Sequence, residues 1–321
     1  MTNSAALARS ITWRSSKQSF ITALLLADRP LVDDCLRAYA YFRWADDAID
    51  ITLPSEKERT AFIARQKKLI EKLYGSESIP DLCPQEQLLA DLIGHDRSSD
   101  SGLHSFICNF MAVIEFDSDR TGRLISTDEL TTYTDHLATA VMDGLQYFIG
   151  NGHPYPRTPE RAMAVTGAHI THMLRDMLED LTSGIVNVPL EAFSAFGISL
   201  EDLDNEPFRQ WVYGQTKKAR QAFMAGQGYI NSISVLRCKL AGFWYLARFE
   251  CILNAIERDG CRLRLDYPER HSPATWLEIV RLGFKVTIEH IAGRLRLMVG
   301  AVHRPVEMPS AARMRSYPSN K

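Results

Sequence analysis

Two short aspartate-rich segments are the part of this sequence best suited to chemistry. The first spans Asp46–Asp50 and the second spans Asp176–Asp180, and each begins and ends with an aspartate. On a helix this spacing directs both carboxylates of a segment to the same face. Like charges so placed repel by about a few tenths of a kcal/mol in water and by more where water is excluded. A partly buried pair therefore favours a bound cation.

Hard oxygen ligands on rigid helices suit Mg²⁺, which usually keeps several waters and bridges one or two carboxylates to substrate phosphates. Two such helices facing each other would hold a diphosphate through several metal ions. The metals would neutralise the leaving group as its C–O bond breaks, which is Lewis-acid catalysis of ionisation. Spacing alone is equally compatible with two solvated helix faces. Both interpretations, a metal site and two solvated faces, therefore stay open on spacing alone.

A di-iron site in a ferritin-like bundle is another way to use carboxylates on helices. Such a site needs a Glu-x-x-His motif on two of its helices. This motif is absent from the sequence, which disfavours a di-iron protein.

Helices are the elements that must position these aspartates, because apolar residues recur at helical spacing and strand-like alternation is scarce. Breaks fall at residues 150–159 and 184–189, and neither a repeat nor a linker divides the chain. We therefore expect one helical domain over residues 1–301. The predicted helices span Leu31–Ile49, Thr60–Tyr74, Gln85–Ile93, Leu103–Glu115, Glu129–Ile149, Glu160–Thr182, Glu206–Ser234, Leu236–Asp259 and Ser272–Ala301.

Composition and charge narrow the class of protein. The 321 residues are 45% hydrophobic and 24% charged, with a net charge of −2, which is typical of a globular protein and gives no reason to expect nucleic-acid binding. Six cysteines without a Cys-x-x-Cys pair favour reduced thiols in a cytoplasmic protein. We find no secretory signal and no apolar run near the roughly 20 residues that a spanning helix needs.

Residues 302–321 are rich in Pro, Ser and basic side chains, and we expect a flexible basic tail. Its cations are Arg304, Arg313, Arg315 and Lys321. They leave open a peripheral contact with an anionic membrane surface as the alternative to a simple disordered end.

Four segments resemble, in order, the signature regions of the squalene/phytoene synthase family. They are Ser16–Phe20 with Arg37–Asp50, then Leu174–Asp180, Ala219–Phe223 and Ile252–Arg258, within a similarity from about Ile11 to about Asp266. The resemblance implies an all-α, single-domain isoprenoid synthase helical bundle. Its central cavity would be lined by the two aspartate segments.

The resemblance also implies roles for individual residues. The aspartates that would bind Mg²⁺, and through it the diphosphate, are Asp46, Asp50, Asp176 and Asp180. The residues that would contact substrate are Ser19, Phe20, Tyr39, Arg43, Tyr133, Arg175 and Tyr245. Among them, Arg43 offers a fork of donors suited to phosphate oxygens. Asp117 roughly matches a further acidic residue of the family.

Two histidines depart from the family pattern. His169 and His172 stand where the family usually has Gln and Asn, and they lie with Asp176 and Asp180 on one helix stripe. We expect His172 to bind a metal, to donate to the diphosphate, or to act as a general base. Imidazole suits Mn²⁺, Co²⁺, Fe²⁺ or Zn²⁺ better than Mg²⁺. A pair hydrogen-bonded inside the bundle is the structural alternative.

The predicted cavity also differs from the family. A run of small residues with two glycines is common there, whereas this chain has Ala138–Met142. Thr139 and Met142 would narrow the channel for prenyl chains. Phe249 replaces a frequent tyrosine, although Tyr245 lies one turn earlier on the same face.

The implied function is head-to-head condensation of two prenyl diphosphates, farnesyl or geranylgeranyl, by a Mg²⁺-dependent transferase of isoprenoid biosynthesis. The expected catalytic residues are Arg43, Asp46, Asp50, His172, Asp176 and Asp180. Two alternatives remain: a terpene cyclase or prenyltransferase that uses one prenyl diphosphate, and a non-catalytic scaffold or assembly relative. Chain length, product, an NADPH requirement, Mn²⁺ in place of Mg²⁺ and oligomeric state stay open.

Overall fold

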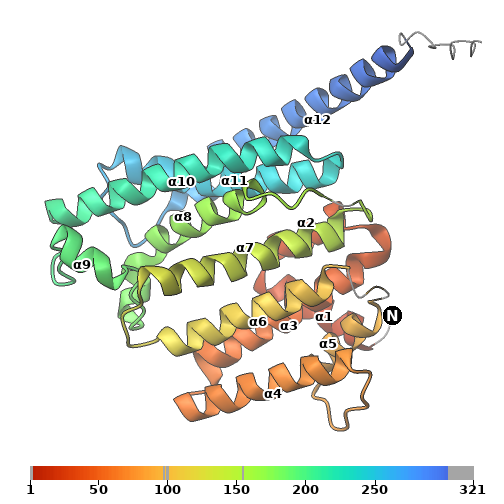
Figure 1. Cartoon of the computed structure of the whole chain (residues 1–321), viewed down its shortest axis with the longest axis horizontal. Coiled ribbons are helices and arrows are strands. Elements are labelled where there is room, and N and C mark those ends of the chain that lie inside the picture. The colour runs from red at the N-terminus through yellow and green to blue at the C-terminus, as the bar shows by residue number, and fades with distance from the viewer. Residues whose placement is uncertain (1–2, 97, 99–100, 154, 303–321) are drawn as a thin grey trace, which may run out of the picture.

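The structure, a computed structural model, describes residues 3–302 except 97, 99, 100 and 154 (Figure 1). Val302 ends the last helix and is the last described residue. The rest of the predicted basic tail lies outside the described residues. The helices are α1 (Asn3–Ser15), α2 (Lys17–Leu26), α3 (Val32–Asp47), α4 (Glu56–Tyr74), α5 (Pro84–Gly94), α6 (Leu103–Arg120), α7 (Thr127–Ile149), α8 (Glu160–Thr182), α9 (Leu190–Phe196), α10 (Glu206–Ser232), α11 (Leu236–Arg258) and α12 (Pro273–Val302). Three short helical turns join them: η1 (Arg29–Leu31), η2 (Ala48–Thr52) and η3 (Pro268–His271).

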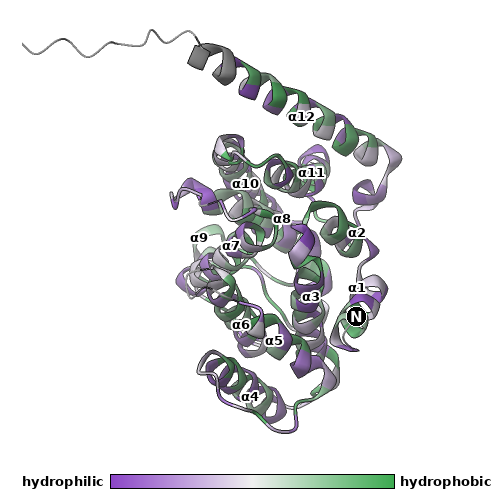
Figure 2. Ribbon diagram, turned by 90° about the vertical axis from the view of Figure 1, so that its right-hand side faces the viewer, coloured by the Kyte–Doolittle hydropathy of each residue, from purple (hydrophilic) through white to green (hydrophobic). Residues whose placement is uncertain are grey.

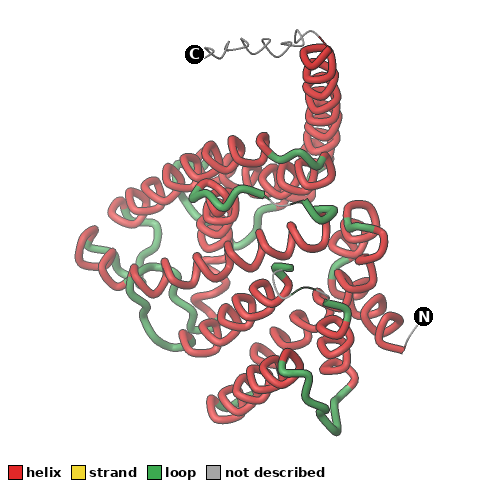
Figure 3. Tube along the Cα trace, turned by 45° about the vertical axis from the view of Figure 1, so that its right-hand side comes forward, coloured by secondary structure: helices red, strands yellow, loops and turns green. Residues whose placement is uncertain are grey.

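The helices form one layered bundle in which long helices lie roughly side by side (Figures 1 and 3). α6 packs on α7, α7 on α8, and α8 on α10 and α11. α3 packs on α1, α5 and α6. No strand occurs in the part of the chain that the structure describes, so the predicted all-α, single-domain fold is confirmed.

Close backbone packing fixes α8, the helix that carries the second aspartate segment. A Cβ atom added at Gly226 of α10 would lie 2.5 Å from the backbone nitrogen of Ala164 in α8. One added at Gly167 of α8 would lie 2.7 Å from the ring of Phe223 in α10. Because the two glycines have no side chain, α8 and α10 approach closely along this contact.

Helix starts follow local capping chemistry. The side chain of Ser55 accepts from the N–H of Glu58 while Glu58 reaches back to Ser55, so α4 begins at Glu56 rather than at Thr60 as predicted. The same reciprocal cap at Ser126 and Glu129 starts α7. α8 has the predicted bounds, Glu160–Thr182. The other predicted helices are present with shifted ends, and the largest shift is that of α6, which continues to Arg120.

Three helices of the structure, α1, α2 and α9, are not predicted from the sequence. The buried residues of α1 include Ala5, Ala8 and Thr12, which are too small to give an apolar periodic signal. α9 has seven residues and is capped by Gly197, which adopts a positive φ of 66°. Short helices of this kind depend on tertiary packing rather than on their own propensity.

A central cavity lies between α7, α8, α10 and α11. Its enclosed space is about 30 Å³, roughly room for a single water molecule. Its lining includes Met142 of α7, Val165 of α8, Ile230 of α10 and Tyr245 of α11. Met142 lies on its wall, as expected, but its lining includes neither of the two aspartate segments that the resemblance placed around the central cavity. Among the described helices, none combines the length and apolarity needed to cross a bilayer.

Candidate active site

The first aspartate segment lies where α3 changes its geometry. α3 ends at Asp47, and η2 is a π-turn in which the N–H of Leu53 donates to the carbonyl of Ala48 at 2.9 Å. The prediction of a regular helix to Ile49 is therefore wrong at this end. Asp46 sits on the last α-turn and Asp50 on the π-turn, so the two carboxylates do not follow regular helix spacing. Single π-turns of this kind often occur at functional sites.

The carboxylates of this segment are partly withdrawn from water. Burial first, and then the charge of Asp50, raise the pKa of Asp46 to about 6, against the opposing charge of Arg43. Burial also raises the pKa of Asp50. Arg43 pairs with Asp47 and lies 3.4 Å from Asp46. This end of α3 holds more negative charge than its single arginine balances.

The second segment lies inside α8, as predicted. Arg175 donates through two nitrogens to the carboxylate of Asp176, and Nε2 of His172 lies 2.7 Å from Oδ2 of the same aspartate. Burial alone would raise the pKa of Asp176, but these two partners hold it well below its ordinary value. Asp180 accepts from Nδ2 of Asn187 at 2.5 Å, and burial raises the pKa of Asp180.

One buried arginine links the two segments. Arg120, the last residue of α6, lies with Nε 2.9 Å from the carboxylate of Asp117 and donates to Oδ1 of Asn187 at 2.9 Å. Asn187 in turn holds Asp180. Burial raises the pKa of both Asp50 and Asp180, and the charge of Arg120 opposes that rise at each. The guanidinium of Arg120 therefore lies within electrostatic reach of both aspartate segments.

The turns after α6 and α8 bring Arg120 and Asp180 together. The N–H of Gly122 donates to the carbonyl of Gly184 at 2.9 Å, so the two turns are hydrogen-bonded to each other. Both glycines have a positive φ, 78° and 77°, which other residues adopt at a cost. This contact places the end of α6 beside the end of α8.

A buried tyrosine and histidine lie behind this arginine. The hydroxyl of Tyr133 donates to Asp117 at 3.2 Å, and its ring centroid is 5.0 Å from that of His169. Burial, then the charges of His172 and Arg120, lower the pKa of His169 to about 3, so its ring is neutral at pH 7. Nε2 of His169 has no hydrogen-bond partner among the described residues.

The path from the second segment to the central cavity is aromatic. The ring of His172 lies 6.3 Å from that of Phe249, and Phe249 lies 5.1 Å from Tyr245. Tyr245 lines the cavity. A molecule that met the second segment at His172 would therefore have its apolar part directed along these rings.

The predicted site residues fall into three groups. The structure brings together Asp46, Asp50, Asp176, Asp180, Arg43, His172, Arg175 and Tyr133 at or between the two segments, and Tyr39 lies one turn before Arg43 on α3. Tyr245 belongs to the cavity. Ser19 and Phe20 lie on α2, where Ser19 contacts Ser16 and Phe20 packs against Trp13. Within the described residues, neither Ser19 nor Phe20 makes a hydrogen bond or ring contact with either segment.

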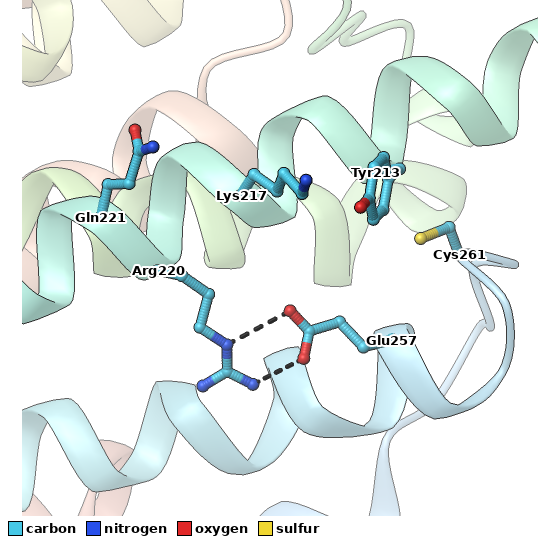
Figure 4. A pocket seen from close by; sticks show the side chains of 6 residues that line it. All are labelled: Tyr213, Lys217, Arg220, Gln221, Glu257 and Cys261. Atoms are coloured by element: carbon cyan, nitrogen blue, oxygen red, sulfur yellow. Dashed lines mark hydrogen bonds and ion pairs between the residues drawn. The ribbon is translucent and has the colours of Figure 1, made fainter.

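The last two signature-like segments meet on the outside of the bundle. Arg220 of α10 donates to both carboxylate oxygens of Glu257 in α11, at 3.2 and 2.7 Å (Figure 4). The pair lines an open pocket of about 560 Å³, together with Lys217 and Cys261. Its observed contacts join α10 to α11 and do not reach the aspartates.

Asp117 was expected from the sequence, whereas Arg120 and Asn187 were not. Arg120 follows Asp117 by one helical turn at the end of α6, and this spacing was its only signal in the sequence. Asn187 lies in a turn, 1% exposed, and nothing in its neighbours marks it as buried.

The residues present fit a diphosphate-bridged magnesium site. Across the described part of the chain, no group of three or more His, Cys, Asp or Glu side chains is arranged to hold an ion by itself. Mg²⁺ commonly takes only one or two carboxylates and completes its shell with water and substrate phosphate. The two aspartate pairs, three of whose four members have a raised pKa, supply such incomplete ligand sets.

Comparisons with known proteins agree with this arrangement. The squalene/phytoene synthase family matches residues 13–276. The bifunctional lycopene cyclase/phytoene synthases of Pyrenophora tritici-repentis and Leptosphaeria maculans are each 24% identical to this chain, over 213 and 211 residues. Each alignment covers 60% of this chain and 36% of the relative, so the chain spans about a third of the length of these relatives.

Solved structures of the same fold are also similar. The squalene synthase HpnC from Alicyclobacillus acidocaldarius superimposes with a TM-score of 0.66 at 18% identity, covering 81% of this chain and 95% of that one. A dehydrosqualene synthase in complex with ligand superimposes with a TM-score of 0.65 at 17% identity, covering 90% and 97%. At these identities the similarity is one of fold.

Proposed function

The chain belongs to the squalene/phytoene synthase family, and from this premise we propose that it condenses two prenyl diphosphates head to head after ionising one of them with bound Mg²⁺. The observation that carries the proposal is the pair of aspartate segments on α3/η2 and α8, joined through Arg120. The substrate is an allylic prenyl diphosphate, farnesyl or geranylgeranyl.

In this proposal the carboxylates of Asp46, Asp50, Asp176 and Asp180 hold the metal ions. The bound metal supplies Lewis-acid neutralisation of the diphosphate. Arg43 and Arg175 stand at the rims of the two segments, where their guanidinium forks are suited to phosphate oxygens. The aromatic side chains of Phe249 and Tyr245 exclude water from the developing carbocation and favour it through their π faces.

His172 is proposed as a further ligand. Its Nε2 lies 2.7 Å from Asp176, so one ion can meet both side chains. Imidazole shifts preference toward Mn²⁺ and related metals. Replacing His172 by Asn is expected to lower activity with Mn²⁺ more than activity with Mg²⁺. An unchanged ratio of the two activities would remove His172 from the metal site.

A one-substrate reaction is the second candidate, and Met142 favours it. Its side chain lies on the cavity wall, where the family commonly has a small residue, and it takes up room that a second chain would need. A terpene cyclase or a prenyltransferase with another acceptor would use the same ionisation site.

The test is incubation of the purified protein with geranyl, farnesyl and geranylgeranyl diphosphates, with Mg²⁺ or Mn²⁺, with and without NADPH. Pyrophosphate release and mass spectra of organic extracts are recorded for the wild type, Asp46→Asn and Asp176→Asn. Asp135→Asn, an exposed aspartate on α7, is the matched control. Release that is lost at Asp46 and Asp176 but kept at Asp135 supports ionisation.

The products then separate the candidates. A hydrocarbon or cyclopropyl diphosphate with two prenyl units supports condensation, and a product with one unit supports the cyclase or prenyltransferase. No pyrophosphate release from any donor would contradict both enzymatic candidates and favour the scaffold protein.

A further inference from the structure

α12 has apolar side chains on two opposite faces. Its inner face packs on α11, where Leu282 and Val286 join the cluster around Phe243, and a Cβ atom on Gly283 would lie 3.2 Å from the indole nitrogen of Trp244. The opposite face carries six large apolar residues that are between 49% and 70% exposed. This outer stripe consists of Leu277, Val280, Phe284, Ile288, Ile291 and Leu295.

The outer stripe is straight. From Leu277 to Leu295 it advances 18 residues, which is about five turns at 3.6 residues per turn and about 27 Å of helix. Its steps of three and four residues occur both in helices that lie on a surface and in helices that pair with another helix. The spacing alone therefore fits both a bilayer surface and a second copy of α12.

α12 also stands clear of the bundle. Its C-terminal half projects beyond the other helices in two views (Figures 1 and 3). Figure 2 shows hydrophobic positions along α12 from its start to its projecting part. Apolar side chains so placed are accessible to a large partner.

Basic side chains border the stripe and acidic ones lie farther from it. At 100° per residue, Arg281 and Lys285 lie about 60–100° to one side of the stripe's centre, and Arg294 lies about 80° to the other. Glu278 and Glu289 lie about 120–140° away, toward the inner face. The border of the stripe therefore carries a positive charge.

A groove beside the stripe has the same sign. It encloses about 500 Å³ between α12 and the segment 234–237, and Ile291 belongs both to it and to the stripe. Its basic or imidazole side chains are His153, Arg237, His290 and Arg294. Among the described residues that line it, none is acidic. Arg237 is already paired with Asp28, so Arg294 carries the charge that a phosphate group would meet in this groove.

We propose that the outer stripe and this groove dock the chain on the surface of a bilayer that contains anionic lipids. The six apolar side chains enter the acyl boundary while Arg281, Lys285 and Arg294 remain at the level of the lipid phosphates. Trp276, half exposed at the start of α12, lies at the same level. The proposal rests on α12 and the groove beside it and is independent of the proposed reaction.

The test is co-sedimentation of the full chain with vesicles of phosphatidylcholine, alone or with phosphatidylglycerol. The wild type is expected to sediment with the anionic vesicles and to be released by salt. Phe284→Glu with Ile288→Glu is expected to lower the partition coefficient at least tenfold. The matched control is Met224→Glu with Leu200→Glu, two exposed apolar residues outside α12, and it should sediment like the wild type.

A second variant covers the case in which the stripe variant does not fold. Arg281→Glu with Lys285→Glu leaves the apolar face intact and should remove the preference for anionic vesicles. Sedimentation of both α12 variants at the wild-type level would place the contact elsewhere in the chain and overturn the proposal. So would a wild type that ignores vesicles and forms a dimer that Phe284→Glu dissociates, because the stripe would then face a second copy.

Discussion

At the scale of single residues, the site depends on one arginine. Arg120 is 9% exposed and meets Asp117 and Asn187 at the same time. A guanidinium can do this because its donors point in several fixed directions, whereas an ammonium group is a single compact charge. Arg120 is a positioning residue: it holds Asn187, and Asn187 holds Asp180.

Replacing Arg120 by Lys tests this role. We expect the concentration of Mg²⁺ needed for half-maximal pyrophosphate release to rise by about tenfold, since Asp180 loses its orientation through Asn187. Asn187→Ala should also raise this Mg²⁺ concentration, although Arg120 stays in place. Both are measured by titrating the metal, with thermal unfolding as a check on the fold. A lower kcat with an unchanged metal requirement would contradict the positioning role.

The sequence predicted the two aspartate segments but not Arg120 and Asn187, which connect them. The two aspartate segments, Arg43, His172 and Arg175 were identified because their spacing or their resemblance to a family is local. Arg120 and Asn187 were missed because their partners lie 67 positions apart in the sequence. That contact exists only once the turns after α6 and α8 are hydrogen-bonded together.

At the scale of elements, one buried carboxylate joins α4 to α5. Glu86, 1% exposed, accepts from Arg65 at 2.6 and 2.7 Å, from Gln66 at 3.0 Å and from the N–H of Cys83 at 3.1 Å. Burial alone would raise the pKa of Glu86, but these hydrogen bonds outweigh it and lower the pKa to about 2. The folded state therefore favours the ionised form.

Glu86→Gln is expected to lower the free energy of unfolding by about 2 kcal/mol at pH 7. Because the folded pKa lies below the ordinary value of 4.5, this contribution is complete above pH 4.5 and decreases as the pH falls toward 2. The difference between wild type and variant in urea unfolding should shrink over that range. Glu201→Gln, at an exposed position, should show no such trend. A difference that is constant with pH would exclude ionisation as its source.

Element prediction succeeded where helices carry large apolar residues at regular spacing and failed elsewhere. α7 and α8 were placed nearly to the residue, whereas α1 buries mainly small side chains and gave no signal. The π-turn at Ala48–Thr52 was also missed, because it ends the helix and no apolar residues of the same helix follow it whose shifted register would reveal the extra residue.

At the scale of the whole molecule, the bundle has little empty space at its centre. The cavity of about 30 Å³ lies where four helices meet, so its volume is set by the side chains that they direct inward. Met142 is flexible and unbranched, and it fills such gaps without strain. In the proposed reaction, the wall of this cavity would limit the length of the prenyl chain that is bound.

Met142→Ala should widen this space and shift chain-length preference. We expect the ratio of kcat/KM for geranylgeranyl over farnesyl diphosphate to rise by about tenfold. Met224→Ala, on the surface of α10, serves as the control. If the ratio is the same in both variants, Met142 does not limit the chain.

The arginine between the two aspartate segments has a thermodynamic consequence. Since one guanidinium opposes the ionisation cost of both Asp50 and Asp180, substitutions at these two positions are not independent events. A double-mutant cycle of Asp50→Asn and Asp180→Asn should yield an interaction free energy of about 0.5–3 kcal/mol, and Arg120→Lys should reduce it. Residues 130 positions apart in the sequence would thus share one energetic unit.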